Sequence, residues 1–246
     1  DELEAASNEL QARCLDAGQR IIDERLFDRF GIPEHAVPAI VKAWNDEPPA
    51  IYGRFDLAYD GVHPPKLLEY NADTPTSLIE SAVVQWYWKE AVHPGADQFN
   101  SIHERLVAKW RELRDYLTDD HLYIAAVADP QAEDLMTASY MRETANEAGL
   151  VTIPLTMGEI GWDRDDKVFR APSGDQIRSI FKLYPWEWMV WEEFGRFALD
   201  SDVQWIEPVW KMLWSNKALL AVLWEMFPNH PNLLPAYLDG PRDLQH

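Results

Sequence analysis

Cysteine, basic residues and long apolar runs are all scarce in this chain. Cys14 is the single cysteine, which excludes a disulfide framework within the chain and fits a reducing compartment. Apolar runs such as residues 82–84 are far too short to cross a bilayer. Lysine and arginine number 22 against 42 aspartates and glutamates, and the formal charge of -20 repels nucleic acid and anionic lipid. We therefore expect a cytoplasmic protein whose partners include neither nucleic acid nor membrane.

Several widespread sequence signatures are absent as well. The chain has no P-loop, no glycine-rich dinucleotide fingerprint and no nucleophile elbow. Its histidines are scattered, and with one cysteine this argues against zinc. Apolar side chains are abundant: 47% of the residues are apolar and 12% aromatic, which suffices for one large domain or two small ones. The negative charge is that of a solvated acidic surface, and it would also attract a cationic substrate such as a polyamine.

Hydrophobic periodicity predicts both helices and strands. The predicted helices cover residues 3–29, 33–44, 78–92, 100–116, 133–148 and 216–227. The predicted strands cover residues 51–57, 66–70, 121–127, 151–155, 177–184 and 205–207. The strand–helix–strand order from residue 121 to 155 is typical of parallel pairing, so the expected fold class is α/β, mixed with α+β character.

Two of these strands carry polar side chains in alternation. Residues i and i+2 of a strand lie on one face, so Arg54 shares a face with Asp56, and Glu69 shares a face with Asn71. Two carboxylates and an amide oxygen suit Mg²⁺, and an arginine beside them can meet a phosphoryl group bidentately. The pattern also fits a solvated polar hairpin with an arginine–carboxylate pair, and both interpretations stay open at this point.

Further candidates are spread along the chain. Hydroxyls of Thr74, Thr76 and Ser77, in a loop before a predicted helix, suit an anion such as a substrate carboxylate, or ordinary helix capping. Lys217 at a helix start could reach a nucleotide phosphate, although most lysines in that position are solvated. Lys182 and Glu187 are charged residues among aromatic ones, a pattern that indicates either a buried ion pair or a substrate contact.

Several segments together resemble the glutathionylspermidine synthase family, and most closely its stand-alone bacterial members that lack the amidase half. The similarity runs from about residue 3 to 246. The segments that carry it are KLLEYNADTPTS at 66–77, RFD at 54–56, FKLYPWE at 181–187, EPVWK at 207–211 and SNKA at 215–218.

The resemblance implies a glutathione-synthetase-like ATP-grasp fold and an ATP- and Mg²⁺-dependent carbon–nitrogen ligase. In such enzymes ATP phosphorylates a carboxylate, that of a glutathione-like peptide, and an amine or polyamine then attacks the acyl phosphate. The implied roles are a γ-phosphate contact for Arg54, magnesium ligation for Asp56, Glu69 and Asn71, ATP binding for Lys217, and contact with the peptide substrate for Thr74, Thr76, Glu133 and Asp134. The family has serines at the two threonine positions, so the hydroxyl is kept.

The chain departs from the family at its C-terminal end. The family continues with a Val-Lys-Pro-type strand and a glycine-rich nucleotide lid, and neither follows Leu244. We therefore expect residues 1–246 to be a partial synthetase domain, cut at both ends, with a substrate-side unit at about 121–185 and no turnover by itself. A rival hypothesis is an ATP-grasp-like module that binds or regulates without ligation. A Mg²⁺-dependent phosphohydrolase is disfavoured, because no water-activating group is evident near the two strands.

Overall fold

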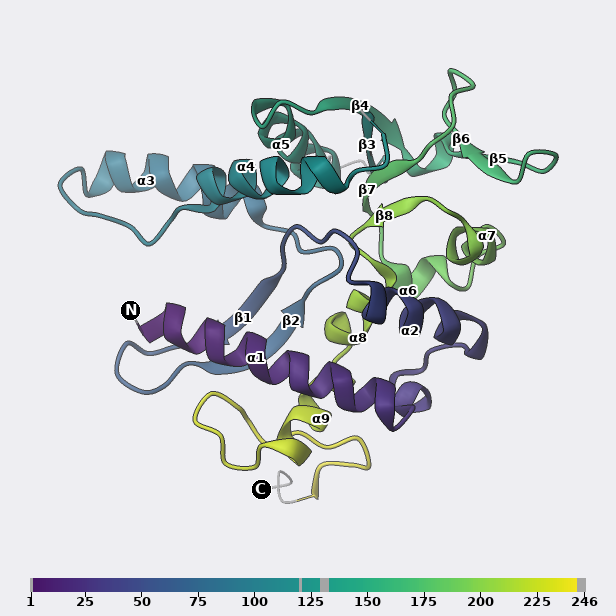
Figure 1. The fold of residues 1–246 in the computed structure, drawn as a ribbon. Helices are drawn as coiled ribbons and strands as arrows, with labels where there is room; N and C mark the ends of the chain where they lie inside the picture. Colours follow the sequence, from purple (N-terminus) through teal and green to yellow (C-terminus); the bar gives the residue numbers. More distant parts are fainter. Residues whose placement is uncertain (1, 120, 129–132, 243–246) are drawn as a thin grey trace. The chain divides into compact units, whose positions relative to one another are not determined.

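The computed structural model describes residues 2–119, 121–128 and 133–242, and the chain divides into two units (Figure 1). The first unit contains the chain up to Asp46, the segment Gly53–Asp73 and the chain from Val209 onward. The second contains Glu47–Tyr52 and Thr74–Pro208. Each unit is therefore assembled from separate stretches of sequence.

The longest helix of the first unit is α1 (Glu2–Asp23). Its apolar residues recur at helical spacing, and Leu10, Cys14 and Ile21 are fully buried. The indole of Trp214 donates a hydrogen bond to the carbonyl of Cys14 (3.0 Å). Burial raises the pKa of the Cys14 thiol to about 12, so the thiol stays protonated and the cysteine is structural.

The predicted helix over residues 3–29 is wrong at its C-terminal end. Helix α1 stops at Asp23, and the 3-10 helix η1 (Leu26–Phe30) follows. The break occurs where Arg25 adopts a left-handed conformation (φ 53°), which a continuous helix cannot contain. The remaining elements of this unit are η2 (Glu34–Ala36), α2 (Val37–Asp46), β1 (Arg54–Ala58), β2 (Lys66–Asn71), η6 (Val209–Lys211), α8 (Met212–Ser215) and α9 (Ala218–Met226).

The second unit is built on a four-stranded parallel sheet with the order β4-β3-β7-β8. Its strands are β3 (His121–Ala126), β4 (Val151–Thr156), β7 (Ser179–Leu183) and β8 (Gln204–Ile206). Helix α5 (Glu133–Glu147) connects β3 to β4 and packs against both, as the sequence predicted. Every residue of β7, and every residue of β3 after the first, is buried, as is typical of the inner strands of a parallel sheet.

Helix α4 (Ile102–Leu113) packs on α5, and Trp110 and Met141 are fully buried between them and the sheet. A separate antiparallel pair, β5 (Gly161–Asp163) and β6 (Val168–Arg170), extends from the sheet in Figure 1. The sequence analysis did not predict this pair, whose two strands are only three residues long. The other elements are η3 (Glu80–Val84, a π-helix), α3 (Gln85–Val92), η4 (Arg114–Tyr116), η5 (Met157–Glu159), α6 (Trp186–Met189) and α7 (Gly195–Asp200).

These elements confirm the expected mixed α/β class. No helix in the described part of the chain has both the length and the apolar character that a bilayer crossing requires.

Candidate active site

Strands β1 and β2 pair antiparallel and bring the four predicted polar residues onto one face. Arg54 lies opposite Asn71, and Asp56 lies opposite Glu69. Directly opposite residues have their Cβ atoms only about 5 Å apart, so the four side chains are neighbours. The side chains of Arg54, Asp56 and Glu69 are 32%, 33% and 31% exposed, which leaves them accessible from solvent.

A β-bulge interrupts the hairpin next to these residues. After the pair of Asp56 with Glu69, continuous pairing would place Leu57 opposite Leu68. Leu57 pairs with Leu67 instead, so Leu68 is the extra residue of the bulge. As a result Leu67 and Tyr70 are both buried although they are three positions apart, while Leu68 is 46% exposed. The sequence did not predict the bulge, and its only signal was the apolar pair at 67 and 68 beside an otherwise alternating strand.

The reverse face of the hairpin packs on aromatic rings. The ring of Tyr70 lies 4.1 Å from that of Phe55 and stacks at 5.3 Å on Trp214. Its hydroxyl donates a hydrogen bond to Gln11 of α1 (3.0 Å). A Cβ atom on Gly53 would lie 2.7 Å from the Tyr70 ring, so glycine lets this strand pass close to it. These contacts hold the strands that carry the polar face.

Each carboxylate on the polar face is paired with a cationic side chain. The Arg54 guanidinium donates two hydrogen bonds to Asp56, from Nε to Oδ1 (2.6 Å) and from the second terminal nitrogen to Oδ2 (3.0 Å). Lys217 forms an ion pair with Glu69 through Oε2, and the Asn71 amide donates to Oε1 of the same carboxylate (3.0 Å). The predicted residues Arg54, Asp56, Glu69, Asn71 and Lys217 are thus brought together in the first unit.

Lys217 is positioned by its neighbours in the segment between α8 and α9. The Ser215 hydroxyl accepts hydrogen bonds from the backbone N–H groups of Ala72 (3.0 Å) and Asp73 (2.8 Å), immediately after β2. The Asn216 side chain accepts from the N–H of Ala218, which begins α9 (2.9 Å), and donates to a carbonyl of η1. The sequence placed Lys217 at a helix start but did not indicate that Ser215 ties this segment to the hairpin.

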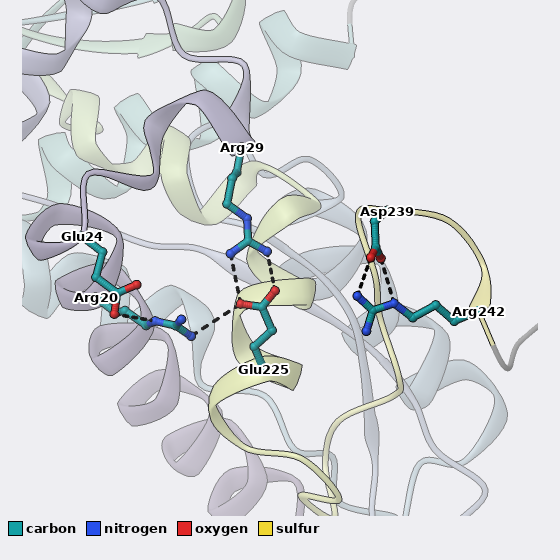
Figure 2. Close-up of polar contacts among 6 residues, drawn as sticks. All are labelled: Arg20, Glu24, Arg29, Glu225, Asp239 and Arg242. Carbon is teal, nitrogen blue, oxygen red and sulfur yellow. Dashed lines mark hydrogen bonds and ion pairs between the residues drawn. The ribbon is translucent and has the colours of Figure 1, made fainter.

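A charged cluster at the other end of α9 fixes that helix to the first unit (Figure 2). Arg29 of η1 donates to both oxygens of Glu225 (3.0 and 2.5 Å), and Arg20 of α1 approaches the same carboxylate at 3.6 Å. The hydrogen bond from Arg29 lowers the pKa of the Glu225 carboxyl below its usual range. Nearby, Asp239 pairs with Arg242 in the same way. The sequence offered no signal for the contacts of Glu225, because Arg20 and Arg29 lie far from it in the chain.

The polar face fits a magnesium ion by the chemistry of its donors. Mg²⁺ takes oxygen ligands and is commonly bound by one or two carboxylates together with substrate phosphates. Asp56 and Glu69 would supply the carboxylates, and Asn71 would add its amide oxygen. No group of three or more histidine, cysteine, aspartate or glutamate side chains that could hold a metal occurs among the residues described. An ion held here therefore needs amide and phosphate oxygens besides the two carboxylates.

The remaining predicted residues lie in the second unit. Thr74 and Thr76 are half-buried in the loop that leads to the helix beginning at residue 78. The carbonyl of Pro75, between them, accepts a hydrogen bond from the Tyr52 hydroxyl (2.8 Å). Glu133 and Asp134 form the first turn of α5, where their charge complements the helix dipole.

Lys182 is fully buried in the middle of β7. Its ammonium donates to the carbonyl of Tyr184 (2.8 Å) and lies 4.8 Å from the centre of the Trp186 ring. The structure thus encloses this lysine within the second unit, and its contact with a substrate stays a prediction.

Glu207 is fully buried, and the sequence analysis did not single out its carboxylate. It accepts hydrogen bonds from the backbone N–H groups of Ile51 (3.0 Å) and Tyr52 (3.1 Å), and its carbonyl accepts from the indole of Trp186 (2.9 Å). An acidic residue between Ile206 and a proline was the available signal. Its role in the structure is to fasten the separate segment 47–52 to the second unit.

Comparison with known proteins finds a family and several relatives. The family model described as "Glutathionylspermidine synthase preATP-grasp" matches residues 1–246. A putative acid–amine ligase of Haemophilus influenzae is 41% identical, over 99% of this chain and 63% of that protein. The trypanothione synthetase of Crithidia fasciculata is 28% identical, over 94% of this chain and 39% of that protein. The bifunctional glutathionylspermidine synthetase/amidase of Escherichia coli is 26% identical, over 95% and 41% respectively. The chain thus spans less than two thirds of the length of each of these relatives.

Proposed function

The chain belongs to the glutathionylspermidine synthase preATP-grasp family, and from this premise we propose that the protein is an ATP- and Mg²⁺-dependent ligase that joins a carboxylate to an amine through an acyl phosphate. Residues 1–246 would form part of its synthetase domain. The names of the relatives support the reaction class, since one is called an acid–amine ligase and others are synthetases of trypanothione or glutathionylspermidine. By the same names, a glutathione-like peptide is the proposed acid and an amine or polyamine the proposed nucleophile.

The net charge and the single cysteine add support. A formal charge of -20 attracts a cationic amine over long range. The thiol of Cys14 is buried and protonated, which fits the proposed cytoplasmic location.

The observation that carries the proposal is the polar face of β1 and β2, where two carboxylates face each other between two cations. Asp56, Glu69 and Asn71 would hold Mg²⁺, which when bound neutralises charge on phosphate oxygens. Arg54 would contact the γ-phosphate with its planar fork and stabilise the charge that develops during phosphoryl transfer. Lys217 would contact a nucleotide phosphate as a point charge.

In the second unit, the Thr74 and Thr76 hydroxyls would hydrogen-bond the acid substrate, and Glu133 and Asp134 would contact the same substrate. Lys182 stays a prediction as a substrate residue. Its enclosed ammonium, bonded to the Tyr184 carbonyl, supports a structural role instead.

The test is amine-dependent release of ADP by the full-length protein of which residues 1–246 are the proposed part, measured across glutathione, other small peptides and several polyamines. Turnover with one acid–amine pair, lost on changing Asp56 to Asn, is the expected result. The absence of turnover with every pair would refute the ligase for those substrates. Calorimetry with Mg²⁺-ATP separates the rival module, which would bind the nucleotide and release no ADP. Binding of Mg²⁺-ATP that survives changing both Asp56 and Glu69 to Ala would refute the metal site.

A further inference from the structure

Both oxygens of the Glu69 carboxylate are engaged by side chains of the first unit. Oε1 accepts a hydrogen bond from the Asn71 amide (3.0 Å), and Oε2 forms the ion pair with Lys217. Glu69 is also one of the two carboxylates suited to a metal ion. The lysine ammonium therefore occupies the side of the carboxylate that a cation would use.

Lys217 and Glu69 differ in how far their side chains are exposed to solvent and can move. The Lys217 side chain is 72% exposed, whereas that of Glu69 is 31% exposed. The backbone on either side of Lys217 is held by the hydrogen bonds of Ser215 and Asn216. A lysine ammonium on its flexible four-carbon stem can thus move while its Cα atom stays in place.

The other cation of the site is less free to leave its carboxylate. Arg54 binds Asp56 through two hydrogen bonds in a planar fork, within one strand, and both side chains are two-thirds buried. An exposed single-contact pair is worth much less than a bidentate one and is readily exchanged. Lys217 is consequently the cation that a metal would displace.

We propose that Lys217 and the metal ion compete for Glu69, so that Lys217 neutralises this carboxylate when no metal is bound and moves to the nucleotide phosphate when the metal takes its place. The inference rests on the proposed function, because it assumes the metal site of Asp56 and Glu69. It adds a coupling between two ligands. The metal releases the lysine that the nucleotide needs, and by linkage the nucleotide strengthens metal binding to the same degree.

The test measures binding of Mn²⁺ without nucleotide, using the electron paramagnetic resonance signal of the free ion, since Mn²⁺ accepts the same oxygen ligands as Mg²⁺. Changing Lys217 to Gln should raise the affinity for Mn²⁺ about two- to fivefold, the range expected from losing an exposed ion pair. The same variant should bind Mn²⁺-ATP more weakly than the wild type. The opposite signs of these two changes distinguish an exchange from a general loss of structure.

A matched control tests whether the rise in Mn²⁺ affinity comes only from the change in net charge. Lys66 begins the same strand β2 and donates to the carbonyl of Pro231 (2.7 Å) rather than to a carboxylate. Changing Lys66 to Gln removes the same charge and should leave Mn²⁺ affinity within experimental error of the wild type. An equal rise in both lysine variants overturns the exchange.

The remaining outcomes distinguish a failure of the Lys217–metal exchange from a failure of the proposed ligase function. A Lys217→Gln variant whose Mn²⁺ affinity is unchanged, reduced or undetectable overturns the exchange, because the lysine then does not hold the place of a cation. The proposed function fails by a different result, namely Mg²⁺-ATP binding that persists without Asp56 and Glu69. Thermal unfolding of every variant, measured in parallel, establishes that the compared proteins are folded.

Discussion

Asp56 and Glu69 are direct partners across the β1–β2 ladder, so two carboxylates stand opposite each other on one face of the hairpin. Like charges in this arrangement oppose strand pairing. Arg54 and Lys217 offset that repulsion in the structure. This face of the hairpin therefore holds cationic side chains, and the proposed magnesium ion would lie on the same face.

Changing Glu69 to Gln should affect the binding of Mg²⁺-ATP much more than the free energy of unfolding. The free energy of unfolding should stay within about 1 kcal/mol of the wild type, because the lost pair with Lys217 is an exposed one. The proposed metal site predicts that Mg²⁺-ATP raises the melting temperature of the wild type, and this rise should disappear in the variant, since a proposed metal ligand is lost. Glu112 forms a comparable exposed pair with Lys109, and its change to Gln should leave the Mg²⁺-ATP effect intact. A wild-type response to Mg²⁺-ATP in Glu69→Gln contradicts the assignment.

Changing Ser215 to Ala should destabilise the protein by about 1–3 kcal/mol, because the buried N–H groups of Ala72 and Asp73 lose their acceptor. Urea unfolding measures the loss. Threonine at the same position keeps a hydroxyl and should recover part of the stability. Ser139 donates to a carbonyl of its own helix and leaves no N–H group unpaired when changed to Ala, so this control should be nearly neutral. Equal stabilities of the Ser215→Ala and Ser139→Ala variants would show that the Ser215 contacts contribute nothing.

Changing Lys182 to Met tests whether this residue is structural. The variant loses the hydrogen bond to the Tyr184 carbonyl inside the core, at a cost of about 1–3 kcal/mol. Lys42 is 80% exposed, and its change to Met should alter stability by less than about 0.5 kcal/mol. Guanidinium unfolding of both variants gives the comparison. A stable Lys182→Met variant with a raised KM for the acid substrate would instead assign the residue to substrate binding.

The cluster in Figure 2 predicts a pH-dependent contribution to stability. Arg29 lowers the pKa of Glu225, so the ionised carboxylate stabilises the folded state. That stabilisation is fully present above the unfolded value of about 4.3 and is lost as the pH falls through the lowered, folded value. Changing Glu225 to Gln should therefore reduce the free energy of unfolding at pH 7, by less than about 1 kcal/mol because the pair is partly exposed.

The measurement for this prediction is urea unfolding of wild type and Glu225→Gln at pH 7 and at about pH 3. The difference between the two proteins should narrow at the lower pH, where the wild-type carboxyl also becomes protonated. A difference that is constant with pH would mean that packing, not charge, explains the effect of the substitution.

The sequence patterns predicted most of the long helices and strands. They did not predict features that depend on the backbone conformation of a single residue. Alternation and helical spacing predicted β1, β2, the parallel strands and α5, because their buried faces extend over several residues. The end of α1 depended on the left-handed conformation of Arg25, which no composition rule favours for arginine. Leu68 shows the same limit, since a bulge adds one residue without changing the character of the strand.

For the candidate site, the i, i+2 rule predicted which side chains share a face, and the register of β1 and β2 confirms that placement. The ion pair of Lys217 with Glu69 joins residues 148 positions apart, and single-sequence patterns carry no information about such a contact. The contacts of Ser215 and Glu207 escaped prediction for the same reason. Their partners are backbone N–H groups, which every residue except proline has.

The division of the chain has a consequence for its connectivity. The polypeptide passes between the units after residues 46, 52, 73 and 208, so no single cut yields either unit intact. In the sequence of the second unit, the hairpin of β1 and β2 is an insertion between residues 52 and 74. The hydroxyl of Tyr52, before the insertion, donates a hydrogen bond to the carbonyl of Pro75, after it (2.8 Å). Deleting residues 53–73 would remove both strands that carry the proposed magnesium ligands. All four strands of the parallel sheet would remain, because they lie within residues 74–208.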